Sequence, residues 1–149
     1  DRGGKLLLGG GRPRELNRGW YFQPTIVAFD HQDFPIVRHE LFGPVLSLLK
    51  FDTEEEAIAM ARDSAYAFAG GVFTTDFPKA LRVARSIPAG RYYVNTYRVA
   101  NIMVPYGGQG ESGYGREGGL QAIYDYTQTK GVVVDLAPDA VADPFVMRS

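Results

Sequence analysis

An alternation of short apolar runs with helical segments constrains the fold of this chain more than any other feature. Apolar runs stand at Val45–Phe51, 72–74 and 92–94. Helical patterns start between them, near Thr53 and near Phe77. Strand, helix, strand, helix, strand is the order of a parallel sheet with right-handed crossovers. The sequence therefore predicts an α/β fold in which a parallel sheet is joined by crossover helices.

Both predicted helices begin with a recognisable cap. Thr53 is followed three residues later by Glu56, which is the spacing of a capping box. The acidic run at 54–56 also suits the positive end of the helix dipole. Asp76 is predicted to cap the second helix, with Pro78 in its first turn. These signals fix where the helices start more firmly than where they end.

Further elements are predicted on either side of this central unit. A short strand at Lys5–Leu8 and an extended segment at Tyr21–Phe29 precede it. After it, a glycine-rich loop at 107–119 leads to a helix at about Leu120–Tyr126. The β-branched run Val132–Val134 is predicted to be a final strand.

Composition excludes several classes of function. Sixteen basic and 17 acidic residues give a net charge of -1, which argues against a nucleic-acid partner. The apolar runs are too short to span a bilayer, so we expect no membrane association and a cytoplasmic location. The chain has no cysteine, which excludes disulfides and a thiol nucleophile. His31 and His39 are too isolated for a metal site, so none is predicted.

One motif has two interpretations. Residues 108–113 match GxGxxG, a helical segment follows, and Asp135 stands where a ribose-binding acid would be expected. This favours a nucleotide site. Against it, Pro105 interrupts the approach, where a buried strand should lead directly into the first glycine. The alternative is a glycine-rich loop whose tight turns place neighbouring side chains.

Several separated strings resemble the aldehyde dehydrogenase family. They follow one another in the family's order and cover almost the whole chain: GWYFQPT at 19–25, ELFGPV at 40–45, DTEEEAI at 52–58, YVN at 93–95, PYGG at 105–108, SGYGRE at 112–117 and TQTK at 127–130. One departure occurs at Gln109 and Gly110, where the family often has an aromatic residue and a lysine.

The resemblance implies a division of the chain. Residues 1–129 would be the distal part of the family's catalytic domain, 130–136 a strand of its oligomerisation arm, and 137–149 a loosely held tail. In the family the cofactor domain, the nucleophilic cysteine, the general-base glutamate and the oxyanion-hole asparagine all lie upstream. The chain would thus be a C-terminal fragment of an NAD(P)-dependent aldehyde dehydrogenase, and alone it is expected to be inactive.

The resemblance also assigns cofactor contacts. Glu40 would accept hydrogen bonds from the ribose hydroxyls beside the nicotinamide of NAD or NADP, a role that suits a two-oxygen acceptor. Phe42 would pack against the nicotinamide ring. The turn at Gly43–Pro44 would present both side chains, since proline fixes φ. The alternatives are a surface glutamate and ordinary core packing of the phenylalanine.

The loop at 96–106 resembles the family's substrate-pocket wall, and its lining positions are predicted to be Arg98, Ala100, Asn101 and Tyr106. Arg98 can pair with a carboxylate-bearing aldehyde through its planar fork, or it can be exposed. No residue of this chain is predicted to be catalytic. We expect Arg98 and Tyr106 to lie within reach of the cavity that holds Glu40 and Phe42, and Asn95 to tie down the loop that follows it.

Three functions therefore compete. The first is part of an enzyme that oxidises an aldehyde to a carboxylic acid. The second is a non-catalytic binding or assembly module that keeps the fold, and the third is a small Rossmann-type nucleotide binder. The apolar strand at 132–134 also predicts self-association, because an unpaired strand edge invites pairing with another chain.

Overall fold

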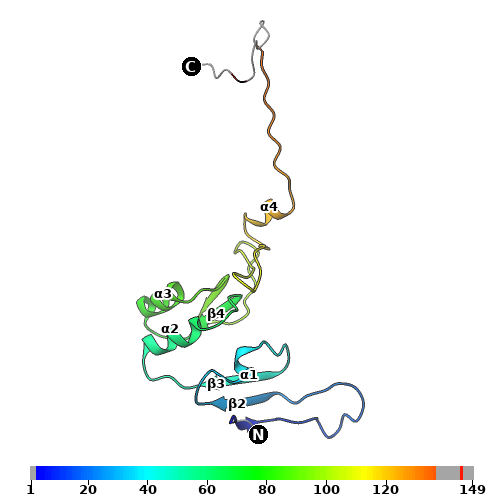
Figure 1. Cartoon of the computed structure of the whole chain (residues 1–149), viewed down its shortest axis with the longest axis vertical. Helices are drawn as coiled ribbons and strands as arrows, with labels where there is room; N and C mark the ends of the chain where they lie inside the picture. The colour runs from blue at the N-terminus through cyan, green and yellow to red at the C-terminus, as the bar shows by residue number, and fades with distance from the viewer. Residues whose placement is uncertain (1–2, 137–144, 146–149) are drawn as a thin grey trace.

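The N-terminal part of the chain forms a three-stranded sheet. The computed structural model describes residues 3–136 and residue 145. Strand β1 (Lys5–Leu8) pairs antiparallel with β2 (Thr25–Phe29), and β2 pairs parallel with β3 (Val45–Leu49), so the order is β1-β2-β3. A single turn of helix, α1 (Pro35–Arg38), lies in the connection between β2 and β3 (Figure 1).

A second unit follows, and it confirms the predicted parallel strands and helix starts. Strand β4 (Ala69–Val72) pairs parallel with β5 (Arg91–Val94), and α3 (Phe77–Ser86) connects them. Helix α2 (Glu54–Arg62) lies beside α3. The expectation that β3, β4 and β5 share one sheet is wrong, because the described strands form two sheets. Periodicity identifies strands, but their pairing depends on contacts between distant residues.

The position of β4 also corrects the sequence prediction. The strand predicted at 72–74 begins earlier, because Gly70 and Gly71 both lie inside β4. The reason is the ring of Tyr92 on β5, which covers Gly70 so closely that an added Cβ would lie 2.6 Å from its Cε2 atom. Glycine here makes room for the aromatic ring across the ladder.

The two helix caps form as predicted. The Thr53 hydroxyl accepts a hydrogen bond from the backbone N–H of Glu56 at 3.1 Å, and the Glu56 carboxylate accepts one from the N–H of Asp52 at 2.8 Å. The Asp76 carboxylate accepts from the N–H of Lys79 at 3.0 Å. Each cap satisfies amide donors that have no partner within the first helical turn.

Helices α2 and α3 are joined by a bidentate ion pair. The Arg82 guanidinium donates to both oxygens of Glu54, at 2.6 and 2.8 Å. This hydrogen bonding lowers the pKa of Glu54 and raises that of Arg82. Arg82 is therefore not a freely solvated cation. On the inner side of α3, Ala80 and Val83 are buried against the strands.

The core is small for a chain of this length. Among the described residues, the buried apolar side chains are Phe29, Ala80 and Val83. The accessible surface is 12653 Å², whereas a compact protein of 16.4 kDa would expose about 7,500 Å². Much of the excess is apolar, as in Trp20, which is fully exposed. The chain therefore presents far more surface than a closed domain does.

The C-terminal part extends away from both sheets. Beyond the glycine-rich loop, helix α4 (Ala122–Asp125) is shorter than the predicted 120–126 segment. The predicted strand at 132–134 is wrong for the structure described, because the segment has no ladder partner there. It runs outward as an extended chain (Figure 1). The predicted tail at 137–149 lies outside the described residues, apart from residue 145.

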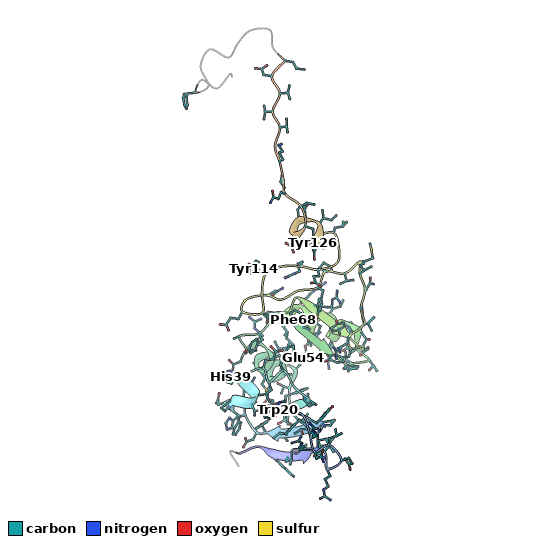
Figure 2. All side chains as sticks on the ribbon, turned by 90° about the vertical axis from the view of Figure 1, so that its right-hand side faces the viewer. Trp20, His39, Glu54, Phe68, Tyr114 and Tyr126 are labelled. Carbon is teal, nitrogen blue, oxygen red and sulfur yellow. The ribbon has the colours of Figure 1, made fainter. Side chains whose placement is uncertain are left out.

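The labelled side chains in Figure 2 follow this elongated order. Trp20 and His39 lie toward the three-stranded sheet, Glu54 and Phe68 near the middle, and Tyr114 and Tyr126 toward the extended C-terminal segment. Residues near one another in sequence therefore stay near one another along the long axis.

Two side chains link the three-stranded sheet to α2 within the described residues. Gln32 donates to the Met60 carbonyl at 2.8 Å. Arg38 donates to the carbonyl and the carboxylate of Asp63, both at 2.7 Å, and to the Asp33 carboxylate at 2.9 Å. The hydrogen bond and charge of Arg38 lower the pKa of Asp63. One guanidinium thus fastens the end of α1 to the end of α2.

We predict that Arg38→Gln accelerates hydrogen exchange at the last amides of both helices, His39 and Asp63, whose N–H groups close α1 and α2. The pKa of Asp63 is depressed in the folded state, so the link is intact above the ordinary value of 3.8 and is lost as pH falls through the folded value. The difference between the two proteins should accordingly shrink in acid. Exposed Arg14→Gln is the control, and equal exchange in both variants would contradict the prediction.

A second prediction concerns Gly90, at the start of β5. A Cβ there would overlap the carbonyl oxygen of Gly107, a backbone atom that cannot move aside easily. Gly90→Ala should lower the free energy of unfolding by about 1–3 kcal/mol, the usual cost of overpacking. Gly11→Ala is the matched control, since its Cβ would meet only the Gln23 side chain at 3.5 Å. Urea unfolding checks both, and equal losses would refute the close approach.

Candidate functional site

The loop between α1 and β3 presents Glu40 and Phe42. The turn that ends this loop is held by two hydrogen bonds, from Thr25 N–H to the Pro44 carbonyl and from Val45 N–H to the Gly43 carbonyl, both at 2.8 Å. Phe42 has φ = 46°, in the left-handed region that a bulky residue rarely adopts. Its ring is 94% exposed. The structure therefore holds an apolar ring outward, which ordinary core packing does not do.

Glu40 lines a cavity of about 520 Å³ between this loop and the second unit. The other lining residues come from the end of α2, from β4 and its approach, and from β5 and its approach: Ala61, Ser64, Tyr66, Phe68, Ala69, Gly70, Gly71, Ile87, Pro88 and Tyr92. Glu40 supplies the only carboxylate among them. The cavity thus combines one exposed anionic acceptor with apolar and aromatic walls.

A second cavity, of about 370 Å³, contains all four predicted substrate-wall residues. It is lined by β5 and by the segments around the glycine-rich loop: Arg91, Tyr93, Arg98, Ala100, Asn101, Ile102, Val104, Tyr106, Glu117 and Gly118. Arg98, Ala100, Asn101 and Tyr106 are therefore brought together in space.

Arg91 organises this second cavity, although no motif in the sequence singles it out. Its guanidinium donates to the Val104 carbonyl at 2.6 Å and to the Pro105 carbonyl at 3.2 and 3.3 Å. It also lies 4.6 Å from the centre of the Tyr106 ring, a cation–π distance. Arg91 thereby fastens the end of the 96–106 loop to β5.

The polar side chains of Asn101 and Arg98, which also line the cavity, differ in their hydrogen bonding. Asn101 caps its own turn, since its side-chain oxygen accepts from the N–H of Met103 at 2.9 Å. Arg98 has φ = 55° and lines the cavity from the same loop. Within residues 3–136 and 145, its guanidinium has no hydrogen-bond or ion-pair partner. Arg98 is therefore the cation whose donors are not occupied by the protein.

Glu40 and the Arg98 loop do not share a cavity, contrary to the sequence expectation. Phe68 lines the Glu40 cavity and Tyr106 lines the other one. Their rings meet edge to face with centres 4.9 Å apart. This aromatic pair joins a residue of one cavity to a residue of the other, a contact that no local pattern in the sequence could indicate.

Asn95 also differs from its prediction. Its side chain accepts from the N–H of Thr74 and donates to the Thr74 carbonyl, both at 2.8 Å. Asn95 has φ = 53°, a conformation that asparagine tolerates better than most residues. It therefore ties down the loop after β4, across the parallel pair, rather than the loop that follows it in sequence.

The GxGxxG segment at 108–113 does not have the geometry of a phosphate cradle. It opens no helix, because α4 starts only at Ala122. Its amides are turned inward: Gln109 N–H donates to the Ala67 carbonyl at 3.1 Å, and Ser112 N–H to the Gln109 carbonyl at 3.1 Å. These observations favour the alternative of a glycine-rich loop, which here packs against the segment that leads into β4. They leave no geometric support for a Rossmann-type site at 108–113.

The described residues also bear on two other kinds of function. No group of three or more His, Cys, Asp or Glu side chains in residues 3–136 and 145 could hold a metal ion. Within the same residues, no helix combines the length and the apolar character that crossing a bilayer requires.

Comparison with known proteins gives one consistent result. The model of the aldehyde dehydrogenase family matches residues 1–132. A betaine aldehyde dehydrogenase of Rhizobium leguminosarum is 43% identical over 137 residues, which cover 91% of this chain and 28% of that protein. The (Z)-2-((N-methylformamido)methylene)-5-hydroxybutyrolactone dehydrogenase of Acinetobacter baylyi is 44% identical and covers 99% of this chain. This chain spans 30% of that second protein.

Solved structures agree with these relatives. The crystal structure of a Mycobacterium tuberculosis aldehyde dehydrogenase complexed with NAD+ superposes with a TM-score of 0.83 at 41% identity. The match covers 93% of this chain and 28% of that one. The fold, the order of the motifs and the sequence identity all point the same way, and the chain belongs to the aldehyde dehydrogenase family.

Proposed function

We propose that this chain is the distal part of the catalytic domain of an NAD(P)-dependent aldehyde dehydrogenase, with residues 1–129 in that domain and 130–136 in an oligomerisation arm. The observation that carries the proposal is the family match over residues 1–132, together with a span of less than a third of the matched relatives. The unusually open surface supports it, because a part of a larger domain leaves apolar faces for the rest to cover.

Glu40 and Phe42 are proposed to contact the nicotinamide end of the cofactor. The two side chains fit such a group: Glu40 offers exposed carboxylate oxygens as acceptors for ribose hydroxyls, and Phe42 offers an exposed ring face. When bound, the nicotinamide supplies a hydride acceptor. The chain's own contribution is to hold and orient that ring, with Arg38 fastening the loop from one side and the Gly43–Pro44 turn from the other.

The loop at 96–106 is proposed to line the aldehyde pocket through Arg98, Ala100, Asn101 and Tyr106. All four border one cavity, which supports the assignment. The chain has no cysteine, and the chemistry of the family requires an activated thiolate that attacks the aldehyde carbon. We therefore propose that another segment supplies this nucleophile and that the 149-residue chain alone is inactive. The cytoplasmic location remains a prediction.

The test is a hybrid enzyme. Replacing the matching segment of the Rhizobium leguminosarum relative by this chain should give a protein that reduces NAD+ in the presence of an aldehyde, measured by absorbance of the reduced cofactor. The isolated chain should give no reduction above background. A folded hybrid without activity would contradict the proposed function, and activity of the isolated chain would contradict the proposed need for a second segment.

In the hybrid, Glu40→Gln should raise KM for NAD+ or lower kcat by about tenfold, because a hydrogen bond to a charged acceptor contributes about 1.5–3 kcal/mol. The melting temperature should change little, since Glu40 is exposed. Exposed Glu15→Gln is the control of equal charge change. Steady-state kinetics over a range of NAD+ concentrations check this, and unchanged cofactor kinetics in Glu40→Gln would remove the assignment.

We also propose that residues 130–136 associate with a second copy of the chain. Val132, Val133 and Val134 are 73%, 97% and 68% exposed, and the segment is extended without a strand neighbour among the described residues. Apolar β-branched residues in such a segment are suited to pairing with another strand. The partner strand would supply the ladder hydrogen bonds that this chain does not.

Light scattering over a concentration series tests the association. The unmodified chain should form dimers or larger assemblies as its concentration rises. Val133→Pro should shift it toward the monomer, because proline removes a ladder donor, whereas Val133→Thr should keep the association, because threonine retains the β-branched shape. A monomer at every concentration, or equal behaviour of the two variants, would rule the arm out as the contact.

A further inference from the structure

We infer that the cavity between β5 and the 96–106 loop binds a carboxylate through Arg98, so that the aldehyde handled there carries a carboxylate group away from its aldehyde carbon. The inference rests on the proposed function for the identity of the ligand as an aldehyde. The recognition of a carboxylate rests on the charges and contacts of the cavity itself.

The lining of the cavity contains more basic than acidic side chains. Two guanidinium groups, those of Arg91 and Arg98, border the cavity together with one carboxylate, that of Glu117. Neither arginine forms an ion pair with Glu117 in the described structure, and the Glu117 backbone is instead paired with Tyr106. The lining therefore carries a net positive charge, which favours an anion and disfavours a cation.

The two arginines differ in whether their hydrogen-bond donors are occupied by the protein. The Arg91 guanidinium donates hydrogen bonds to the carbonyls of Val104 and Pro105 and thereby supports the loop. Arg98 has its donors available and is exposed to the cavity. A planar guanidinium with a free edge matches both oxygens of a carboxylate through two parallel hydrogen bonds. Arg91 is thus the positioning residue, and Arg98 is the residue that touches the ligand.

The backbone of Arg98 also adopts an uncommon conformation. Arg98 has φ = 55°, a left-handed conformation that costs free energy for a residue with a side chain. Glycine or asparagine would adopt it more easily, yet the position holds an arginine whose side chain has no hydrogen-bond or ion-pair partner among the described residues. Such a strained residue commonly marks a ligand-binding site, where the conformation aims a side chain. Here the side chain reaches the cavity wall.

The aromatic residues of the cavity do not offset this preference. A quaternary ammonium group would need an open ring face. The Tyr106 ring already has the Arg91 guanidinium 4.6 Å from its centre, and its edge contacts Phe68. Tyr93 meets Tyr97 edge to face at 6.4 Å. A ligand with an anionic end and a short apolar body fits this lining better than a trimethylammonium compound of similar size.

The inference is tested by substrate selectivity in the hybrid enzyme. The experiment measures kcat/KM for three aldehydes of different charge. They are 4-oxobutanoate, which carries a carboxylate, butanal, which is neutral, and betaine aldehyde, which is cationic. Arg98→Gln should lower the ratio of 4-oxobutanoate to butanal by about tenfold, the loss expected for one charge-assisted pair. Arg98→Lys should lie between, because lysine keeps the charge and loses the fork. Arg85→Gln, an exposed arginine on α3, is the control.

A binding measurement makes the result independent of catalysis. Titration of the 149-residue chain with butyrate, followed by NMR of the arginine side-chain Nε–H signals, should shift Arg98 and not Arg85. Butanol and choline should leave Arg98 unmoved. If the isolated chain proves unfolded, the selectivity ratio decides instead.

The outcomes separate the two proposals. Butyrate binding at Arg98 together with an inactive hybrid would leave the carboxylate site standing and refute the enzymatic role. An active hybrid whose selectivity ratio is unchanged in Arg98→Gln would keep the enzymatic role and overturn the carboxylate site.

Discussion

The guanidinium of Arg38 is the contact on which the placement of Glu40 depends. The three-stranded sheet and the β4–β5 pair share no ladder, and within the described residues Arg38 and Gln32 provide the side-chain hydrogen bonds that hold the sheet to α2. Glu40 follows Arg38 by two residues, so the same link that joins the units brings a carboxylate to the edge of β4. The cavity around Glu40 exists because two otherwise separate units are fastened at that point.

A second set of contacts divides the surface beside the sheet pair. Arg91 covers Tyr106, and Tyr106 meets Phe68 edge to face. Phe68 borders the Glu40 cavity, Tyr106 borders the Arg98 cavity, and the stack fastens the loop that carries Arg98. Cofactor contact is proposed for the first cavity and aldehyde contact for the second. The Phe68–Tyr106 contact would link the positions of the two ligands.

The open surface gives these local contacts unusual weight. With few apolar side chains buried, the described structure depends on caps, on the Arg82–Glu54 pair and on close backbone approaches such as that of Gly90 to Gly107. A larger core would make each of these a minor contribution. The exposed apolar residues are consistent with a piece of a catalytic domain whose remaining faces are covered by other segments.

Local signals in the sequence determined the elements of this protein and its family. The capping box at Thr53, the Asp76 cap, the strand at Val45 and the ordered family motifs all depend on neighbours within a few residues, and the structure or the comparisons agree with them. Tertiary structure alone decided the rest: the two separate sheets, the place of Gly70 under Tyr92, the absence of a ladder partner for the 132–134 segment among the described residues, and the contact between Phe68 and Tyr106. Each of these depends on side chains more than 20 residues apart or on another segment, and no periodic pattern records which distant side chains will meet.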